Sequence, residues 1–322
     1  TRTTSAGWAT VFPSGTVAPN ASNLNWVAGQ TVANLVTVPV GGDGAVAIFN
    51  AGGSVDLIAD VVGWFDDGST GSGSLYNPVN PARVLDSRVA GGPYAFPWSA
   101  GEARTVQVAG VANSGVPASG VTAVVVNLTV TDTTAAGYAT VYPTTSPLPN
   151  ASNLNWGPRE TRPNLVSVPV GPDGRIAIWN AVGSADFIVD VVGYYAAGGA
   201  GFHPAQPTRI LDSRVGTGGY DTPWPGGASR PLQATGTYGS GVPTSGVVAV
   251  ILNVTVTDTT AVGYLTVHPA GPDVPTASNL NWMPGITVPN QVISKLSATG
   301  VADVVNSSGS TDVIADVSGW FG

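Results

Sequence analysis

Recurrent aspartates are the residues in this chain whose types and spacing could do chemistry. The pattern Asp-x-Ile-x-Asp-Val-[Val/Ser]-Gly occurs three times, with Asp60, Asp190 and Asp316 as its second aspartates. Asp86 and Asp212 recur within the sequence Leu-Asp-Ser-Arg. Two carboxylates suffice for glycoside hydrolysis without histidine or cysteine, so a catalytic carboxylate pair is one interpretation. It would place identical active sites in tandem, which is unusual.

Structural ion pairs are the interpretation we favour for these aspartates. In a strand, Asp60, Asp190 and Asp316 have apolar neighbours on both sides, and an isolated buried charge costs several kcal/mol. Arg83 and Arg209 are the predicted partners of Asp190 and Asp316, because a guanidinium can bind a carboxylate through two hydrogen bonds. Asp60 has no such arginine before it. We expect it to pair with an arginine of another chain or with Arg83.

The two histidines, His203 and His268, do not repeat. Their counterparts one repeat earlier are Asn77 and Tyr142, whereas a site that repeats with the fold would repeat its ligands. No Asp-x-Asp-x-Asp-Gly calcium loop, Gly-x-Ser-x-Gly elbow or phosphate-binding glycine loop is present. We therefore expect no metal site, no cofactor and no enzymatic activity.

The hexapeptide Ala-Ser-Asn-Leu-Asn-Trp occurs unchanged at 21–26, 151–156 and 277–282. In an extended segment its leucine and tryptophan point one way and its asparagines the other. We expect Leu and Trp to fill the core while the asparagines bond loop backbone. The alternative is a neutral sugar-binding patch of amides and aromatic rings. Its candidate ligand or partner contacts are Asn23, Asn25, Trp26, Asn153, Asn155, Trp156, Asn279, Asn281 and Trp282.

The elements that position these residues recur with a repeat in the sequence. The tryptophans of the second and third hexapeptides, Trp156 and Trp282, lie 126 residues apart (282 − 156). We predict the second half of a repeat at 1–65, a linker at 66–74, a complete repeat at 75–195, a linker at 196–201 and a complete repeat at 202–322. Thr1 corresponds to Thr131 and Thr257. Nothing in residues 1–65 has the pattern of a first half.

Short apolar runs between turns predict an all-β fold, and no amphipathic helix of ten residues is recognisable. We predict tandem antiparallel β-sandwich-like units of about 126 residues, with about eight short strands each. Faint similarity between the halves gives five half-units, so a five-bladed β-propeller is the alternative. Segments 7–13 and 45–50 are expected strands, with an Asp43-Gly44 turn before the second. Segment 56–65 is the most apolar, and we expect it inside a sheet.

Composition excludes several classes of partner. The chain has 322 residues, a formal charge of −8 and one lysine, Lys295, so we expect no binding to nucleic acid. No run approaches 18 apolar residues, so we expect no membrane insertion. The absence of cysteine excludes disulfides and thiolate chemistry. No signal-peptide pattern opens the sequence, so any signal peptide has been removed or lies upstream.

Several motifs taken together resemble a known family. They are Pro-x-Arg-[Val/Ile]-Leu-Asp-Ser-Arg, Gly-Val-Pro-x-Ser-Gly-Val, Asn-[Leu/Val]-Thr-Val-Thr-Asp-Thr-Thr, the hexapeptide, and Asp-Val-[Val/Ser]-Gly-[Trp/Tyr]-[Phe/Tyr]. This set resembles tandem modules of secreted and cell-surface actinobacterial proteins, which are often appended to peptidoglycan- or polysaccharide-degrading domains. The resemblance implies an extracellular, non-catalytic repeat with a binding, spacer or assembly role.

Two functions are compatible with these observations. The first is a structural or adhesive protein of the bacterial cell surface, which assembles with itself or with other surface components through its unpaired N-terminal half. An open sheet edge in that half would require a strand from elsewhere. The alternative is a carbohydrate-binding, lectin-like module for cell-wall or environmental glycans.

Overall fold

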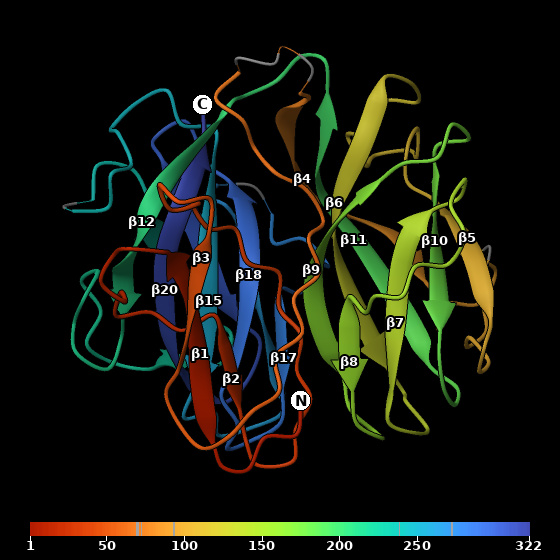
Figure 1. Cartoon of the computed structure of the whole chain (residues 1–322), viewed down its shortest axis with the longest axis horizontal. Helices are drawn as coiled ribbons and strands as arrows, with labels where there is room; N and C mark the ends of the chain where they lie inside the picture. The colour runs from red at the N-terminus through yellow and green to blue at the C-terminus, as the bar shows by residue number, and fades with distance from the viewer. Residues whose placement is uncertain (69–70, 72, 93, 238, 272) are drawn as a thin grey trace. The chain divides into compact units, whose positions relative to one another are not determined.

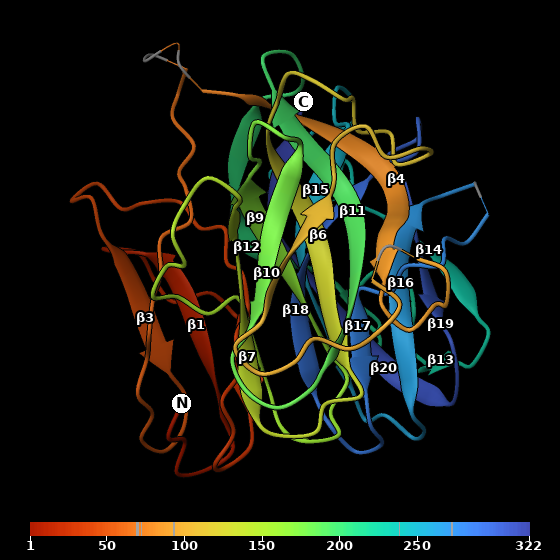
Figure 2. The ribbon, with the colours of Figure 1, turned by 90° about the vertical axis from the view of Figure 1, so that its right-hand side faces the viewer.

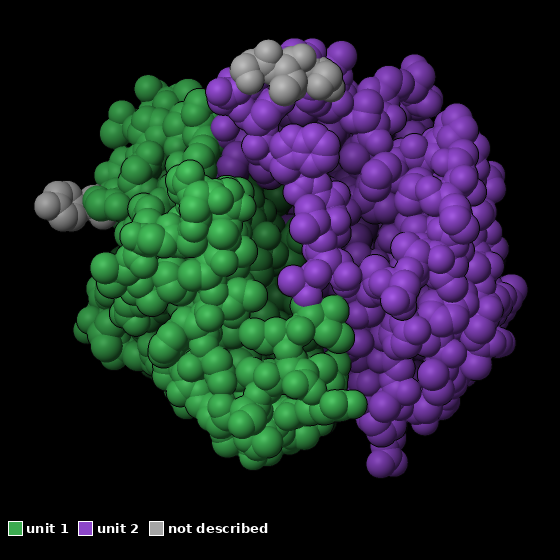
Figure 3. Space-filling view, in the orientation of Figure 1, with its two compact units in different colours: residues 1–58, 203–274, 278–322 green, residues 59–202, 275–277 purple. Residues whose placement is uncertain are grey.

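The computed structural model describes residues 1–68, 71, 73–92, 94–237, 239–271 and 273–322. Every regular element in these residues is a β-strand (Figure 1), so the all-β prediction is confirmed. None of the described residues form a helix long and apolar enough to cross a membrane. The chain divides into two compact units, coloured separately in Figure 3. One unit contains residues 59–202 and 275–277, and the other contains 1–58, 203–274 and 278–322.

The unit built on residues 59–202 contains two four-stranded sheets. The first has the order β4 (Leu75–Asp86), β11 (Asp186–Ala196), β6 (Val121–Thr131) and β9 (Arg162–Pro169). The second has the order β5 (Ala103–Gln107), β10 (Arg175–Asn180), β7 (Gly137–Pro143) and β8 (Leu154–Trp156). Side chains from both sheets, such as Val126, Val189 and Ile178, belong to one buried cluster. The two sheets therefore enclose a single core.

The other unit repeats this arrangement in its C-terminal part. One sheet has the order β12 (Phe202–Asp212), β20 (Ser310–Phe321), β15 (Ala249–Thr257) and β18 (Val288–Lys295), with β13 (Trp224–Pro225) paired to β20. The next has the order β14 (Ser229–Gln233), β19 (Val301–Asn306), β16 (Gly263–Pro269) and β17 (Leu280–Trp282). These two sheets also share one buried cluster.

Residues 1–58 contribute one three-stranded antiparallel sheet to the same unit. Its order is β2 (Leu24–Trp26), β1 (Gly7–Pro13) and β3 (Val46–Asn50), seen in red and orange in Figure 1. The predicted strands at 7–13 and 45–50 are thus present. The predicted turn before β3 is present too, since Gly44 has a φ of 77° and donates to the Gly41 carbonyl. This sheet is the counterpart of β8-β7-β10 and of β17-β16-β19.

Five small antiparallel sheets therefore make up the described chain, equal in number to the half-units, although each sheet of a complete repeat combines strands from both halves. This matches the five-bladed propeller alternative. Within each complete repeat, two of these sheets enclose one core, as in the sandwich-like units predicted first. Part of the predicted linker at 66–74 (residues 69, 70 and 72) lies outside the described residues. The shorter predicted linker, 196–201, lies between the end of β11 and the start of β12.

Segment 56–65, expected inside a sheet, forms no strand, and this prediction was wrong. It is the orange trace without arrows that follows β3 in Figure 2. Its counterpart β11 pairs with β4 on one side and β6 on the other, and both partners come from the first half of the repeat. Residues 1–65 have no first half. Segment 34–40, the counterpart of β9, lacks a strand for the same reason, because β9 pairs with β6.

Candidate assembly interface

An arginine–aspartate network joins the first and last strands of the repeat at 75–196. Arg83 Nε donates to Asp190 Oδ1 at 2.8 Å and Nη2 to Oδ2 at 3.1 Å, the two-bond pairing expected from the sequence. Asp190 is fully buried. Burial raises its pKa, and the hydrogen bond from Arg83 acts in the opposite direction. Arg83 also reaches Asp86, whose pKa is lowered by the hydrogen bond that it accepts from Arg88.

The C-terminal repeat contains the same network at equivalent positions. Arg209 binds Asp316 through Nε at 2.9 Å and Nη2 at 3.2 Å, and Nη1 reaches Asp212 at 3.1 Å. Asp316 is almost completely buried, and burial raises its pKa. Because each of these carboxylates is bound to an arginine across neighbouring strands, the network holds the sheet together. It does not have the open geometry of an acid–base pair.

Asp60 differs from Asp190 and Asp316 because it is exposed. Arg83 binds Asp190, and none of the salt bridges among the described residues includes Asp60. The alternative that Asp60 pairs with Arg83 is therefore wrong. Pairing with an arginine from another chain stays a prediction.

The hexapeptides are used internally in all three copies. Asn23, Asn153 and Asn279 accept hydrogen bonds from the backbone of the neighbouring strand at 2.6–2.7 Å. Asn25, Asn155 and Asn281 accept from the serine three residues earlier. Trp26, Trp156 and Trp282 are buried. The core interpretation therefore fits, and these rings cannot stack on a ligand at the surface.

The two histidines have separate structural surroundings. His203 stacks on Trp320 with ring centroids 3.9 Å apart. His268 is buried on β16, with Nδ1 3.0 Å from the Pro269 carbonyl oxygen. Neither belongs to a group of three or more potential metal ligands within the described ranges.

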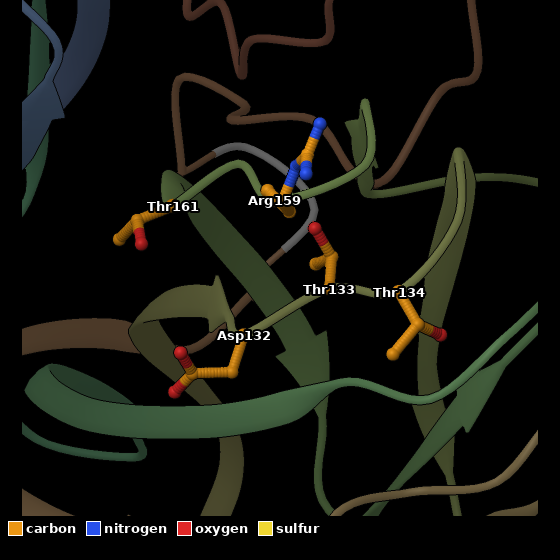
Figure 4. Close-up of a pocket in the computed structure, with 5 residues that line it drawn as sticks. All are labelled: Asp132, Thr133, Thr134, Arg159 and Thr161. Carbon is orange, nitrogen blue, oxygen red and sulfur yellow. The ribbon is translucent and has the colours of Figure 1, made fainter.

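A cavity of about 490 Å³ is lined by Asp132, Thr133, Thr134, Arg159 and Thr161 (Figure 4). Its threonine hydroxyls bond to their own repeat, as Thr133 does to the Gly157 carbonyl and Thr161 to Thr131. Arg159 has a left-handed φ of 58°, where the other two copies have Gly29 and Gly285. Asp132 recurs as Asp258, but the arginine is present in this copy alone, so the complete charged lining of the cavity does not recur with the fold.

The most distinctive surface is the closing segment, which we define as residues 56–65 and which forms no strand, although Asp56 at its start is hydrogen-bonded to the backbone of Thr1. Val61 is 89% exposed, whereas the equivalent Val191 and Val317 are completely buried. Trp64 is 85% exposed, and Ile58 is also exposed. Phe65 ends the segment, stacked on Phe202 at 4.2 Å. A contiguous exposed apolar stretch of this kind marks an interaction site.

Segment 34–40, the other segment that forms no strand, is held by hydrogen bonds that involve amide side chains. Thr37 N donates to Gln291 Oε1 at 2.7 Å, and Gln291 N donates to Asn34 Oδ1 at 3.0 Å. Asn253, in the middle of β15, donates to the Ser22 carbonyl and accepts from Asn34 Nδ2. Amide side chains thus join the sheet β12-β20-β15-β18 to the first hexapeptide at Ser22 and to the segment after it at Asn34 and Thr37.

Sequence reasoning missed this docking role of Asn253. In the sequence, Asn253 and its counterpart Asn127 each begin an Asn-x-Thr glycosylation pattern inside an apolar run, and this position indicates only a structural role. Both are buried. A second docked loop precedes the third hexapeptide, where the Thr276 carbonyl accepts from Arg83 Nη2. The available signal was a polar amide recurring within a run of β-branched residues.

No protein-family model, curated protein or solved structure matches this chain.

Proposed function

We propose that this chain is a non-catalytic, extracellular structural repeat protein of the bacterial cell surface that assembles through its unpaired N-terminal half. The single observation that carries the proposal is the exposed closing segment 56–65. Two copies of the same pattern are buried strands in this chain, and the third lacks both neighbouring strands. Burying such a segment against a partner is favourable by about 25 cal/mol per Å² of apolar surface.

Cell-surface placement is supported by composition and by the family resemblance. Only 9% of the residues are charged, and cysteine is absent. A surface of threonine, serine, asparagine and glycine suits packing against neighbouring modules. Protease treatment of intact producing cells tests the placement: an extracellular chain is cleaved without lysis, and an internal one is not.

Assembly is tested with a charged substitution in the closing segment. Val61→Asp is expected to abolish any higher-mass species of the purified chain, because a desolvated carboxylate opposes burial. Val17→Asp is the matched control, since Val17 is equally exposed, at 90%, but lies in a loop outside the segment. Without a partner, 56–65 should be cleaved readily in limited proteolysis. A monomer at high concentration whose residues 1–65 resist protease would exclude assembly through this half.

Carbohydrate binding is the second candidate, and one observation favours it. Trp8, Tyr138 and Tyr264 occupy equivalent positions on β1, β7 and β16 and are exposed by 45%, 36% and 45%. Tyr138 also packs edge-on against Trp179. Exposed rings of this kind can stack on the apolar faces of neutral sugars. A glycan array with the triple variant Trp8→Ala, Tyr138→Ala and Tyr264→Ala as control tests this: hits that survive the substitutions would reject these positions.

A further inference from the structure

The sheet β5-β10-β7-β8, labelled at the right of Figure 1, has one face that is turned away from the buried cluster of its repeat. Ile176 and Ile178 of β10 belong to that cluster, so Arg175 and Trp179 lie on the opposite, outer face. Trp179 packs edge-on against Tyr138 of β7, with ring centroids 5.5 Å apart. Because Tyr138 is 36% exposed, the outer face presents a pair of aromatic rings to solvent.

An amide donor lies beside these rings. Asn155 of β8 is in register with Tyr138, and strand alternation places both side chains on the outer face. Asn155 Oδ1 accepts from Ser152 Oγ at 3.2 Å, which fixes the orientation of the amide, and no described group accepts from its Nδ2. Aromatic rings beside a free N–H donor suit a sugar, because the rings pack on its apolar face while the donor binds a hydroxyl.

Arg175 adds a positive charge to the same face. Its guanidinium donates to Gln107 Oε1 at 2.9 Å and reaches Thr105 Oγ1 at 3.5 Å, and both of these partners are neutral. The nearby Asp173 accepts instead from Thr144 Oγ1 and from the backbone N of Arg175. Among the residues that the structure describes, no carboxylate forms a salt bridge with this guanidinium. The charge of Arg175 is therefore available to a ligand.

The two equivalent sheets lack this combination of rings and cation. In β3, Phe49 stands where β10 has Trp179, and an alanine stands where β10 has the arginine. In β19 both equivalents are valines, and Asp303 lies between them on the same face. The rings therefore recur in part, whereas the cation is present in the middle sheet alone.

We propose that the outer face of the sheet β5-β10-β7-β8 binds an acidic polysaccharide, whose sugar units carry carboxylates. A sugar ring packs on Tyr138 and Trp179, and Asn155 Nδ2 donates to one of its hydroxyls. Arg175 binds the carboxylate of a sugar further along the polymer. The two ends of the site are about 13 Å apart, at 3.3 Å per residue along β10, so the ligand spans several sugar units. This inference rests on the carbohydrate-binding candidate proposed above and names its ligand class.

Charge favours an acidic ligand over a neutral one. Hydrogen bonds between a guanidinium and a carboxylate are about twice as strong as those between neutral groups. A guanidinium has five N–H donors, and Arg175 uses only some of them on its two neutral partners. A nucleic acid would also bring negative charge, but the formal charge of −8 on the whole chain opposes binding to a dense row of phosphates.

The ligand class is tested with paired probes and the full chain. Polygalacturonate, alginate and hyaluronate are each compared by calorimetry with the same polymer after methyl esterification of its carboxylates. We expect at least one acidic polymer to bind at least about fivefold more tightly than its ester, and to bind more weakly in about 0.5 M salt, where exposed charges are screened.

The outcomes separate this inference from the carbohydrate-binding candidate. An ester that binds as tightly as its acidic polymer would overturn the inference and keep the candidate. An absence of binding to all three acidic polymers, with hits on neutral glycans in the array, would also overturn the inference alone. An array without any hit would reject both.

Substitutions locate the site. Arg175→Gln should reduce affinity for the acidic polymer at least about fivefold and leave affinity for its ester unchanged. Arg159→Gln is the matched control, because Arg159 is also exposed but lines the cavity shown in Figure 4. Trp179→Ala should reduce affinity for both forms at least about tenfold, and Trp179→Phe should retain most of it. Equal effects of the two arginine variants, or unchanged binding in Trp179→Ala, would overturn the proposed site.

A gain of binding cannot be produced by misfolding. Trp8 and Phe49 of the sheet β2-β1-β3 are exposed rings at the equivalent positions, and Ala45 is exposed where β10 has its arginine. Ala45→Arg should therefore add a second site for acidic oligosaccharides to each chain, measured as the stoichiometry of binding. Val301→Arg is the matched control, because β19 has a valine in place of the second ring and carries Asp303. Unchanged stoichiometry in Ala45→Arg would overturn the pairing of rings with a cation.

Discussion

Segments 56–65 and 186–195 have nearly the same sequence and opposite structures. Both follow the pattern Asp-x-Ile-x-Asp-Val-Val-Gly followed by two aromatic residues. The second is an interior strand of its sheet, with Val191 completely buried, whereas the first forms no strand and exposes Val61. Intrinsic β-propensity is nearly equal in the two segments, so it does not decide between these structures. Burial between neighbouring strands does.

The sheet β2-β1-β3 in residues 1–58 shows the opposite case, in which the strands do form. β1, β2 and β3 form without any first-half strands, because their strand-pairing partners all lie within residues 1–58. The repeat therefore consists of two parts with different requirements. One sheet forms from the second half alone, and the other needs strands from both halves.

Among the changes that test this comparison, replacing the arginine that binds the buried aspartate of a complete repeat should cause the largest loss of stability. Arg209→Ala leaves Asp316 buried and uncompensated, so we expect a loss of about 3 kcal/mol in the C-terminal repeat. Amide protection should fall in β12, β15 and β20 and persist in β4, β6 and β11. Arg83→Ala should give the reverse pattern. Unchanged melting and exchange in both variants would show that the ion pairs do not hold these sheets together.

Replacing the two equivalent valines by alanine should cause a smaller loss of stability at Val191 and almost none at Val61. Val191→Ala removes buried methyl groups and should destabilise its repeat by about 2 kcal/mol. Val61→Ala should change stability by less than about 0.5 kcal/mol, because the side chain is exposed. Chemical denaturation monitored by fluorescence measures both. Equal losses would mean that segment 56–65 is buried in solution.

The smallest expected effect is the change in stability at acid pH that depends on Asp86. This residue has no counterpart in residues 1–65. The hydrogen bond from Arg88 lowers the pKa of Asp86 below its usual 3.8 in the folded chain. As pH falls, the unfolded chain therefore takes up the proton before the folded chain does. The stability that Asp86 contributes is fully present above the unfolded pKa and is lost as pH falls through the folded pKa. Asp86→Asn should lower stability at about pH 6 and matter progressively less below about pH 4.

Urea unfolding at several pH values measures this dependence, with Asp212→Asn as the equivalent change in the other repeat. For Asp190 the pH dependence of stability has the opposite sign. Burial raises its folded pKa and so favours the protonated form, and the stability that it contributes is lost as pH rises. A constant gap between Asp86→Asn and the original chain across the acid range would contradict the assigned pKa direction.

Local signals made much of the fold predictable. Short apolar runs between turns located β1 and β3, and the Asp43-Gly44 pair located a turn that is present. Segments 34–40 and 56–65 could not be placed by local pattern, because their strand partners are far away in sequence and absent from residues 1–65. The same pattern at 186–195 gave the right result only because β4 and β6 lie beside it.

The candidate site was predictable only in part, for a related reason. Arg83 and Asp190 could be matched because a buried carboxylate requires a cation, and two copies of each motif occur. The docking of Asn253 on the Ser22 carbonyl required knowledge of which loop lies against which sheet. Such contacts between segments distant in sequence leave no periodic signal.

The exposed aspartate in segment 56–65 also bears on solubility. An exposed segment rich in Val, Ile and aromatic residues, without proline, is the kind of sequence that stacks into fibrils. A charge within such a stretch acts as a gatekeeper, because identical segments aligned in register would bring like charges together. Asp60 therefore opposes the in-register stacking of copies of this segment.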